Sequence, residues 1–252
     1  MNKKNVLFLH IPKTAGTTIQ TGFIDIAEKN KNIIFTKGAV AGLNDHFSFD
    51  HFKHINLNQD FHILKGHFVF SESCKKFKLF TMVRDVLDLF ISNLYYFYSE
   101  YLRTNVNLEN INHIKKNITL KLDQSVDDCL IISNLLKNNF VNSNIITKTI
   151  AGIPFEKFYF VKEDYKIMEE DYLQAVENLK YFSYIGNTEN VNKFLNIFLK
   201  SIPINTFEIR HKRIFKKDPK LINTIKNVLG EQIKEYNYFD NKILDCIKNR
   251  FT

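Results

Sequence analysis

The chain has 252 residues, of which 44% are hydrophobic and 25% charged; this suits one large folded domain and excludes an intrinsically disordered protein. It contains no run of about 18 apolar residues, so we expect no transmembrane segment. Lys and Arg number 35 against 27 Asp and Glu, and the formal net charge of +8 favours an anionic partner: nucleic acid, a membrane surface, an acidic glycan or a phosphorylated ligand.

Short β-like runs alternate with helical patterns along most of the chain. In order, we predict a strand at Val6–His10, a helix at Thr14–Lys29, strands at Phe61–Lys65 and Lys78–Val83, helices at Leu87–Leu102 and Ser125–Phe140, a strand at Lys157–Val161, a helix at Lys166–Lys180, a strand at Phe182–Ile185, and helices at Asn190–Lys200, Pro219–Leu229 and Glu231–Asn249. This alternation predicts the α/β class, with a mostly parallel central sheet flanked by helices. No linker is evident, so we expect a single domain over residues 1–252, with an insertion or lid at Thr104–Asp123.

The cysteines and the N-terminal residues bear on the cellular compartment. Cys74, Cys129 and Cys246 are odd in number and widely spaced, which favours free thiols in a reducing compartment over a disulfide framework or a zinc site. The apolar run Val6–Leu9 is too short for the core of a signal peptide. We therefore expect a cytoplasmic protein, and the positive charge leaves a peripheral position at a membrane open.

The connection between the first predicted strand and helix has the chemistry of an anion-binding loop. Residues 10–18 read His-Ile-Pro-Lys-Thr-Ala-Gly-Thr-Thr. A strand that leads directly into a helix presents unpaired N–H groups and the positive end of the helix dipole. Lys13 adds a mobile charge, Gly16 allows close approach of an anion, and hydroxyl donors come from Thr14, Thr17 and Thr18.

The order of residues in this loop excludes an ordinary nucleoside triphosphatase. The Walker A pattern places its lysine after the glycines, whereas Lys13 precedes Gly16 here. A capped helix with an exposed lysine is the alternative reading of the same residues.

Residues 10–18 closely resemble the 5′-phosphosulfate-binding loop of carbohydrate sulfotransferases related to the heparan sulfate 2-O- and 6-O-sulfotransferases. Further segments resemble that family in the same order: Gly66-His67-Phe68 its Gly-His motif, Thr81–Asp85 with Ser92 and Tyr95-Tyr96 its 3′-phosphate motif, and Asn144–Gly152, Tyr184–Glu189 and Tyr236–Leu244 its later segments. The chain departs from the family at Val86, where a proline is usual, and at Lys148, where an arginine is usual. We also expect no membrane anchor, in contrast to the eukaryotic members of that family.

The resemblance implies a P-loop nucleotide-hydrolase-like sulfotransferase fold and 3′-phosphoadenosine 5′-phosphosulfate (PAPS) as the sulfuryl donor, with no metal. It implies that Lys13 neutralises the departing phosphate. The donor-binding residues that it implies are Lys13, Thr14, Ala15, Gly16, Thr17 and Thr18 at the 5′ end, Arg84 and Ser92 at the 3′-phosphate, and Thr188, Arg210 and Lys212 as further contacts.

His67 is the candidate general base, because an acceptor hydroxyl is a poor nucleophile and neutral imidazole, with a pKa of about 6.5, can take its proton. Any one of the eight histidines could instead be structural, and the place of His67 within Gly-His-Phe is what singles it out. His10 could orient Lys13 or touch the donor. We expect the remaining histidines of the irregular segment to line a surface or an acceptor cleft; they are His46, His51, His54 and His62.

The densest basic run, Ile209–Lys217, has two open readings: a lid over the donor or the rim of a site for an acidic substrate. The resemblance favours a glycan or glycoconjugate acceptor, and the net charge favours an acidic one. The alternatives are a small-molecule or lipid hydroxyl as acceptor, an unconventional nucleotide kinase, or a basic nucleic-acid-binding protein. The last lacks a motif that reads RNA or DNA and leaves the first loop unexplained.

Overall fold

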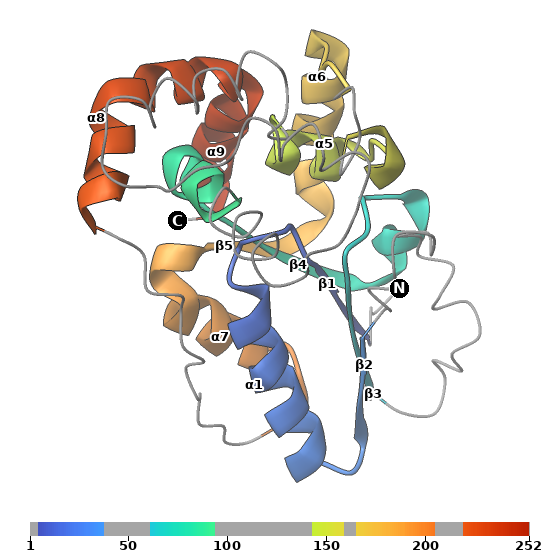
Figure 1. The fold of residues 1–252 in the computed structure, drawn as a ribbon. Helices are drawn as coiled ribbons and strands as arrows, with labels where there is room; N and C mark the ends of the chain where they lie inside the picture. Colours follow the sequence, from blue (N-terminus) through green and yellow to red (C-terminus); the bar gives the residue numbers. More distant parts are fainter. Residues whose placement is uncertain (1–4, 38–60, 94–142, 159–164, 205–218, 252) are drawn as a thin grey trace, which may run out of the picture.

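The structure, a computed structural model, describes residues 5–37, 61–93, 143–158, 165–204 and 219–251 (Figure 1). At its centre is a five-stranded sheet in the order β2-β3-β1-β4-β5, and every pairing in it is parallel. The strands are β1 (Val6–Leu9), β2 (Ile33–Lys37), β3 (Phe61–Gly66), β4 (Lys78–Val83) and β5 (Phe182–Asn187). The predicted α/β class and parallel central sheet are therefore confirmed.

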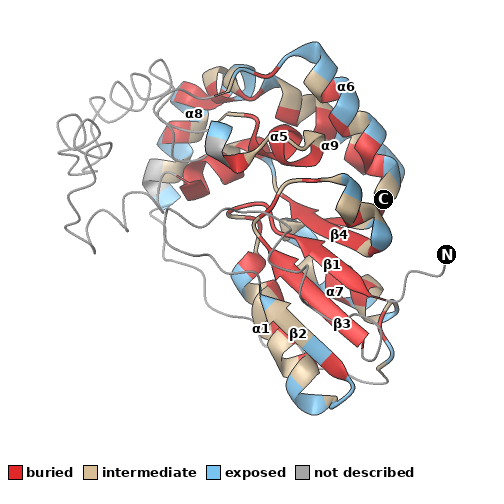
Figure 2. Cartoon of the chain, turned by 90° about the vertical axis from the view of Figure 1, so that its right-hand side faces the viewer, coloured by how far each residue is buried: buried red, intermediate tan, exposed pale blue. Residues whose placement is uncertain are grey.

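The central strands are buried on both faces because helices cover both sides of the sheet (Figures 1 and 2). On one face, Val6 and Phe8 of β1 pack in a core with α1 (Gly16–Lys29) and α7 (Val191–Leu199). On the other face, Leu7 and Leu9 pack in a core with α5 (Ile145–Ala151), α6 (Glu169–Asn178) and α9 (Tyr238–Phe251). Helix α8 (Pro219–Tyr236) precedes α9.

Short connections complete the described part of the chain. Residues 86–93 are helical and follow β4 directly. Single turns of 3₁₀-helix lie at η2 (Glu72–Lys76), η3 (Phe155–Lys157), η4 (Leu179–Tyr181) and η5 (Thr188–Asn190). None of the helices described combines the length and the hydropathy that crossing a membrane requires.

Helix α9 holds α5 in place through a buried carboxylate. Asp240, 1% exposed, accepts hydrogen bonds from Ile146 N–H at 3.1 Å and from the N–H and hydroxyl of Thr147, both at 2.7 Å. In return, Asp240 N–H donates to the side-chain oxygen of Asn144 at 3.0 Å. Burial raises the pKa of Asp240 to about 6, although the hydrogen bonds act in the opposite direction. The carboxylate supplies acceptors that the start of α5 would otherwise lack.

Most predicted elements are found close to their expected bounds, with four differences. The sequence pattern did not predict β2 or α5. It placed the break between the last two helices at Gly230, whereas α8 continues to Tyr236. The predicted strand Lys157–Val161 is wrong at its start, since Lys157 ends a 3₁₀ turn. Of the predicted helix Leu87–Leu102, residues 87–93 are helical; its remainder, the rest of Lys157–Val161, the helix Ser125–Phe140 and the insertion Thr104–Asp123 lie outside the described residues.

Candidate functional site

Three central strands end side by side and carry the candidate site. Strand β1 lies between β3 and β4, and Leu9 is in register with both Gly66 and Thr81. The segments that follow these strands, residues 10–15, His67 and Arg84, therefore meet at one edge of the sheet. After β1 the chain enters α1 on one face, and after β4 it enters residues 86–93, of which Leu89 packs in the core of the other face. Ligands of open α/β sheets bind at such a switch point, beyond the carboxyl ends of the strands.

The loop after β1 has an unusual backbone. Lys13 (φ 64°) and Ala15 (φ 60°) both lie in the left-handed region, which non-glycine residues seldom adopt. Thr14 is fully buried, and its hydroxyl donates to the carbonyl oxygen of Ile11 at 2.7 Å, so this side chain shapes the loop from within. Thr17 is exposed and Thr18 is half-buried at the start of α1. Left-handed residues in a tight segment are a common way to turn backbone N–H groups toward one anion.

Gly16 is required by its contact with His10. An ideal Cβ on Gly16 would lie 1.6 Å from Nε2 of His10, so any side chain there would overlap the imidazole. The sequence reading assigned Gly16 to close approach of an anion. The structure adds a second reason for the glycine, because the buried His10 ring lies against it.

His67 is held in one orientation by His10. Its Nδ1 lies 2.9 Å from the carbonyl oxygen of His10, and the two rings lie against each other, with centroids 4.0 Å apart and planes tilted by 35°. A carbonyl can only accept, so Nδ1 carries the hydrogen and the neutral ring has its lone pair on Nε2. Burial, followed by the positive charges of Lys65 and Lys37, lowers the pKa of His67 to about 4, and the hydrogen bond to His10 opposes this shift. The ring is therefore neutral near pH 7.

A buried lysine completes this cluster, and the sequence reading missed it. Lys65, on β3 and 2% exposed, places Nζ 3.2 Å from Nδ1 of His10 and 3.3 Å from Oε1 of Gln20. Burial, then the charge of Lys37, lowers the pKa of Lys65 to about 8. Burial also lowers the pKa of His10 well below its ordinary value, and neighbouring positive charges add to the shift. Lys65 stands two residues before His67 in a largely apolar strand, but nothing in the local sequence distinguishes it from a lysine that extends to solvent.

Arg84 faces the loop from the end of β4. Its Nη1 donates to the carbonyl oxygen of Lys13 at 3.5 Å, and its Nη2 lies 4.0 Å from a carboxylate oxygen of Asp88. Lys226 of α8 approaches that carboxylate more closely, at 2.9 Å. Among the described residues, the buried Nε of Arg84 has no hydrogen-bond partner. Burial lowers the pKa of the guanidinium, with Asp88 and Asp85 opposing. The guanidinium thus keeps donor capacity that its carboxylate neighbours do not use.

The other predicted site residues divide into two groups. Ser92 is buried in the helix that follows Arg84, and Thr188 begins the turn after β5, at the same edge of the sheet because Val83 and Asn187 are in register. Outside the described residues lie Arg210, Lys212, His46, His51 and His54. The expectation that His62 lines a surface or a cleft is wrong, because His62 is the second residue of β3 and 3% exposed.

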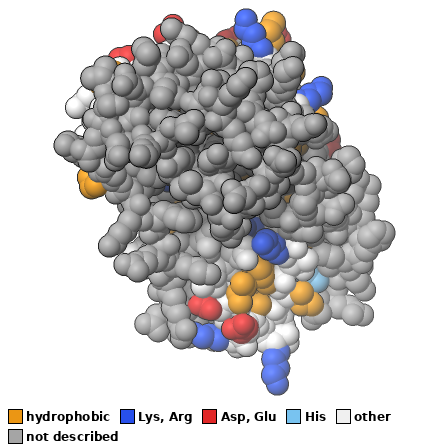
Figure 3. Space-filling model, in the orientation of Figure 1, with side chains coloured by type: hydrophobic (Ala, Val, Ile, Leu, Met, Phe, Trp, Pro, Cys, Tyr) orange, Lys and Arg blue, Asp and Glu red, His pale blue; other side chains and the backbone are white. Residues whose placement is uncertain are grey.

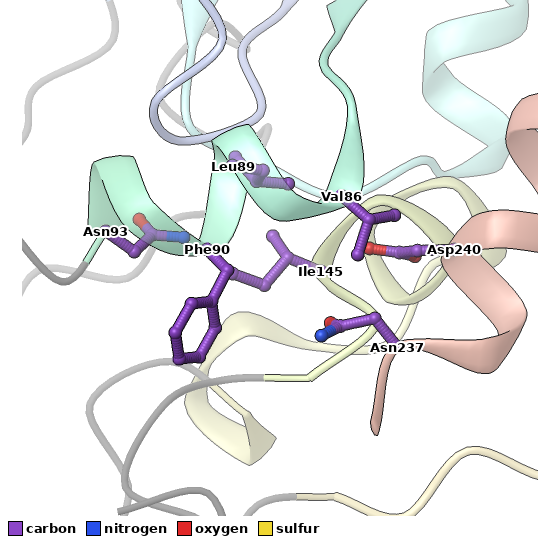
Figure 4. A pocket seen from close by; sticks show the side chains of 7 residues that line it. All are labelled: Val86, Leu89, Phe90, Asn93, Ile145, Asn237 and Asp240. Atoms are coloured by element: carbon purple, nitrogen blue, oxygen red, sulfur yellow. The ribbon is translucent and has the colours of Figure 1, made fainter. Parts of the chain in front are cut away.

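A small pocket lies beneath the helix that follows β4 (Figure 4). Its lining is Val86, Leu89, Phe90, Asn93, Ile145, Asn237 and Asp240. The helical spacing places Arg84, Asp88 and Ser92 on a different side of this segment. Val86, where the resemblance leads one to expect a proline, is buried and lines this pocket. No group of three His, Cys, Asp or Glu side chains suited to a metal ion occurs in the described parts of the chain.

No protein-family model matches the chain, and no curated protein shows a significant match to it. What the fold and the site define is an α/β protein with a loop, a neutral histidine and an arginine gathered at the carboxyl edge of a parallel sheet.

Proposed function

We propose that the protein is a sulfotransferase of the P-loop-like fold, which moves the sulfuryl group of PAPS to a hydroxyl of a glycan or glycoconjugate. The observation that carries this proposal is the position of His67. Its Nδ1 is fixed 2.9 Å from the His10 carbonyl, and it stands at the same edge of the sheet as the Lys13 loop and Arg84. A neutral base beside two cationic groups suits transfer of an anionic group to a hydroxyl.

In this proposal the donor lies across the loop and the end of β4. The left-handed backbone at Lys13 and Ala15 and the start of α1 bind the 5′-phosphosulfate end. Arg84 and Ser92 bind the 3′-phosphate, and the unpartnered Nε of Arg84 supports this assignment because a phosphate can accept from a guanidinium in bidentate fashion. Thr188, Arg210 and Lys212 remain proposed as further donor contacts.

The reaction is an in-line displacement, by analogy with phosphoryl transfer. The acceptor oxygen forms a bond to sulfur as the bond from sulfur to the 5′-phosphate oxygen breaks. Nε2 of His67 takes the proton of the acceptor hydroxyl, and the electron pair of the broken bond leaves with the phosphate. Lys13 stabilises the negative charge that develops on this leaving oxygen. These groups require no metal.

Charge distribution bears on the acceptor and on the nucleic-acid alternative. Over α1, the part of the surface that Figure 3 colours by side-chain type carries acidic and basic groups beside hydrophobic ones. Within the described residues, this part of the surface is therefore mixed in charge, unlike the uniform basic patch typical of nucleic-acid-binding proteins. The net charge of +8 is better accounted for by a donor with several negative charges, and it favours an acidic glycan.

A transfer assay with radiolabelled PAPS tests the proposal. The acceptor panel includes acidic and neutral glycans, small hydroxyl compounds and lipids, and the sulfated position is then mapped. We expect label on a glycan hydroxyl. Label on a small molecule or a lipid instead would show that the acceptor belongs to a different class from the one proposed. No transfer to any acceptor would refute the proposed activity.

Two variants separate catalysis from donor binding. His67→Gln keeps an N–H that can donate to the His10 carbonyl but removes the base, so it should abolish transfer while the donor product still binds. Lys13→Ala should weaken both. Wild-type turnover by His67→Gln would remove His67 as the base.

A further inference from the structure

The buried ammonium of Lys65 has an environment that is costly for a charge. It is 2% exposed, and its neighbours at hydrogen-bond distance are two uncharged groups, Nδ1 of His10 and Oε1 of Gln20. Within the described residues no carboxylate lies at ion-pair distance from Lys65, and the charge that acts on it, that of Lys37, is also positive. Burying a lysine without a carboxylate partner is unfavourable for folding. A role in the site would explain why a lysine occupies this position.

The contacts of Lys65 lead to His67 through His10. The ammonium contacts one edge of the His10 ring at 3.2 Å, and the ring is held on another side against Gly16. His10 then contacts His67 twice, by its ring at 4.0 Å between centroids and by its carbonyl at 2.9 Å from Nδ1. A change at Lys65 must therefore reach the orientation of the His67 ring.

Lys65 also acts on His67 by its charge. The groups that face His67 are Lys65 on the preceding strand β3, Lys37 on β2 and His10 on the loop, and those that face His10 include Lys13 as well. All the charges in this set are positive, and a nearby positive charge favours the neutral form of an imidazole. Lys65 is the largest of the charges that lower the pKa of His67.

We propose that Lys65 is a positioning residue for His67: through its contact with His10 it fixes the His67 ring, and its charge adds to burial in favouring the neutral form of that ring. The inference rests on the proposed function, in which His67 takes the proton of the acceptor. Lys65 itself touches neither the donor nor the acceptor.

The test replaces Lys65 by methionine, which keeps the length of the side chain and removes its charge and hydrogen bonds. Lys193→Met, at an exposed position of α7, removes a charge that is not among those that shift the pKa of His67 or His10, and is the matched control. The first readout is the titration of the His67 ring, followed by nuclear magnetic resonance of ring-labelled histidine. We expect the pKa of His67 to rise by about one unit in Lys65→Met and to stay unchanged in Lys193→Met.

The second readout is kcat at pH 7.5, where His67 is neutral in all variants. We expect Lys65→Met to lower kcat about tenfold by misplacing the ring, with little change in the KM of the donor. In a His10→Ala background the same substitution should cause no further loss, because the connection is already broken. Full additivity of the two losses would contradict a path through His10.

Stability measurements separate an effect of these substitutions on folding from an effect on the His67 ring. Removal of a buried unpaired charge should leave Tm of Lys65→Met equal to or above that of the wild type, and Lys65→Gln serves the same titration if the methionine variant does not fold. A His67 titration that is unchanged in both variants would overturn the role of Lys65. The titration needs no donor, so the absence of transfer by the wild-type protein would refute the proposed function separately.

Discussion

The contact between Gly16 and His10 makes a sharp prediction for Gly16→Ala. The added methyl group would lie 1.6 Å from Nε2, 2.0 Å from Cε1 and 2.3 Å from Cδ2 of His10. The ring would have to retreat by about 1.8 Å to reach an ordinary contact of 3.4 Å. Such a shift would break the 3.2 Å contact with Lys65 and the ring contact with His67, whose centroid lies 4.0 Å away.

Two opposing contributions determine how far Gly16→Ala changes the stability of the protein. Overpacking of a buried site costs about 1–3 kcal/mol, and alanine at a helical position recovers up to about 1 kcal/mol. We expect Gly16→Ala to lower the free energy of unfolding by about 1–2 kcal/mol, or Tm by roughly 5 °C in a chain of this size. Transfer should fall about a hundredfold, because His67 loses its support.

Urea unfolding and the transfer assay measure both quantities, and Gly230→Ala is the control. Among the described residues, a Cβ on Gly230 would meet only Leu87, at 4.0 Å, so the same substitution in α8 should stabilise the protein by about 0.5–1 kcal/mol and leave transfer unchanged. In Gly16→Ala/His10→Ala, stability should recover while transfer does not. Wild-type stability and turnover of Gly16→Ala alone would refute the packing of His10 on Gly16.

Three further predictions concern Asp240, His67 and Arg84. Asp240→Asn turns an amide N–H toward a backbone donor of α5 and should cost about 1–3 kcal/mol in urea unfolding. Folding raises the pKa of Asp240 from 3.8 to about 6, so the folded state binds more protons than the unfolded state. The contribution of this group to the free energy of unfolding is therefore full below pH 3.8 and is lost as pH rises through 6. The Asn variant should lack this pH dependence of stability. The kcat/KM of the wild type should stay level from pH 7 to about pH 5 and fall near pH 4, where His67 becomes protonated; an acid limb near pH 6.5 would contradict the buried, neutral imidazole. Arg84→Lys should weaken binding of adenosine 3′,5′-bisphosphate about tenfold in calorimetry, because lysine cannot bind bidentately, and an unchanged affinity would remove Arg84 from the site.

The elements that the sequence predicted well are those with a strong local pattern. The strands β1, β3 and β4 are short runs of mostly apolar residues, and α1 and α7 carry apolar residues at helical spacing. The alternation of strands and helices predicts a parallel sheet, and in a parallel sheet the carboxyl ends of the strands lie along one edge. For that reason Lys13, His67 and Arg84 could be expected to lie together before their positions were known.

The missed elements depend on contacts distant in sequence. Strand β2 lies at the edge of the sheet, and Ile33 is its single buried residue, so its pattern is weak. Helix α5 reads Ile-Ile-Thr-Lys-Thr-Ile-Ala, a composition rich in β-branched residues that favours a strand. It is helical with Asn144 and Asp240 bound at its N-terminus, and Asp240 comes from the far end of the chain.

In the candidate site, too, some features follow from the local sequence and others depend on contacts between distant residues. Residue types and their order indicated a base, a cationic loop and an arginine, but no local pattern indicates that Lys65 is buried or that His10 lies against Gly16. Lysine in a strand usually extends to solvent, and only the packing of α1 over β3, with Gln20 beside Lys65, gives it a buried position.

The central claim is that the carboxyl edge of the sheet binds a nucleotide with a 3′-phosphate, and calorimetric titration tests it most directly. Wild-type protein is titrated with adenosine 3′,5′-bisphosphate, with ATP and with a short oligonucleotide, and Lys13→Ala and Arg84→Met are titrated with the bisphosphate. We predict binding of the bisphosphate at one site per chain, weaker binding by both variants, and no comparable binding of ATP or the oligonucleotide. Binding of ATP or the oligonucleotide without binding of the bisphosphate would contradict the assignment of this site and the sulfotransferase proposal with it.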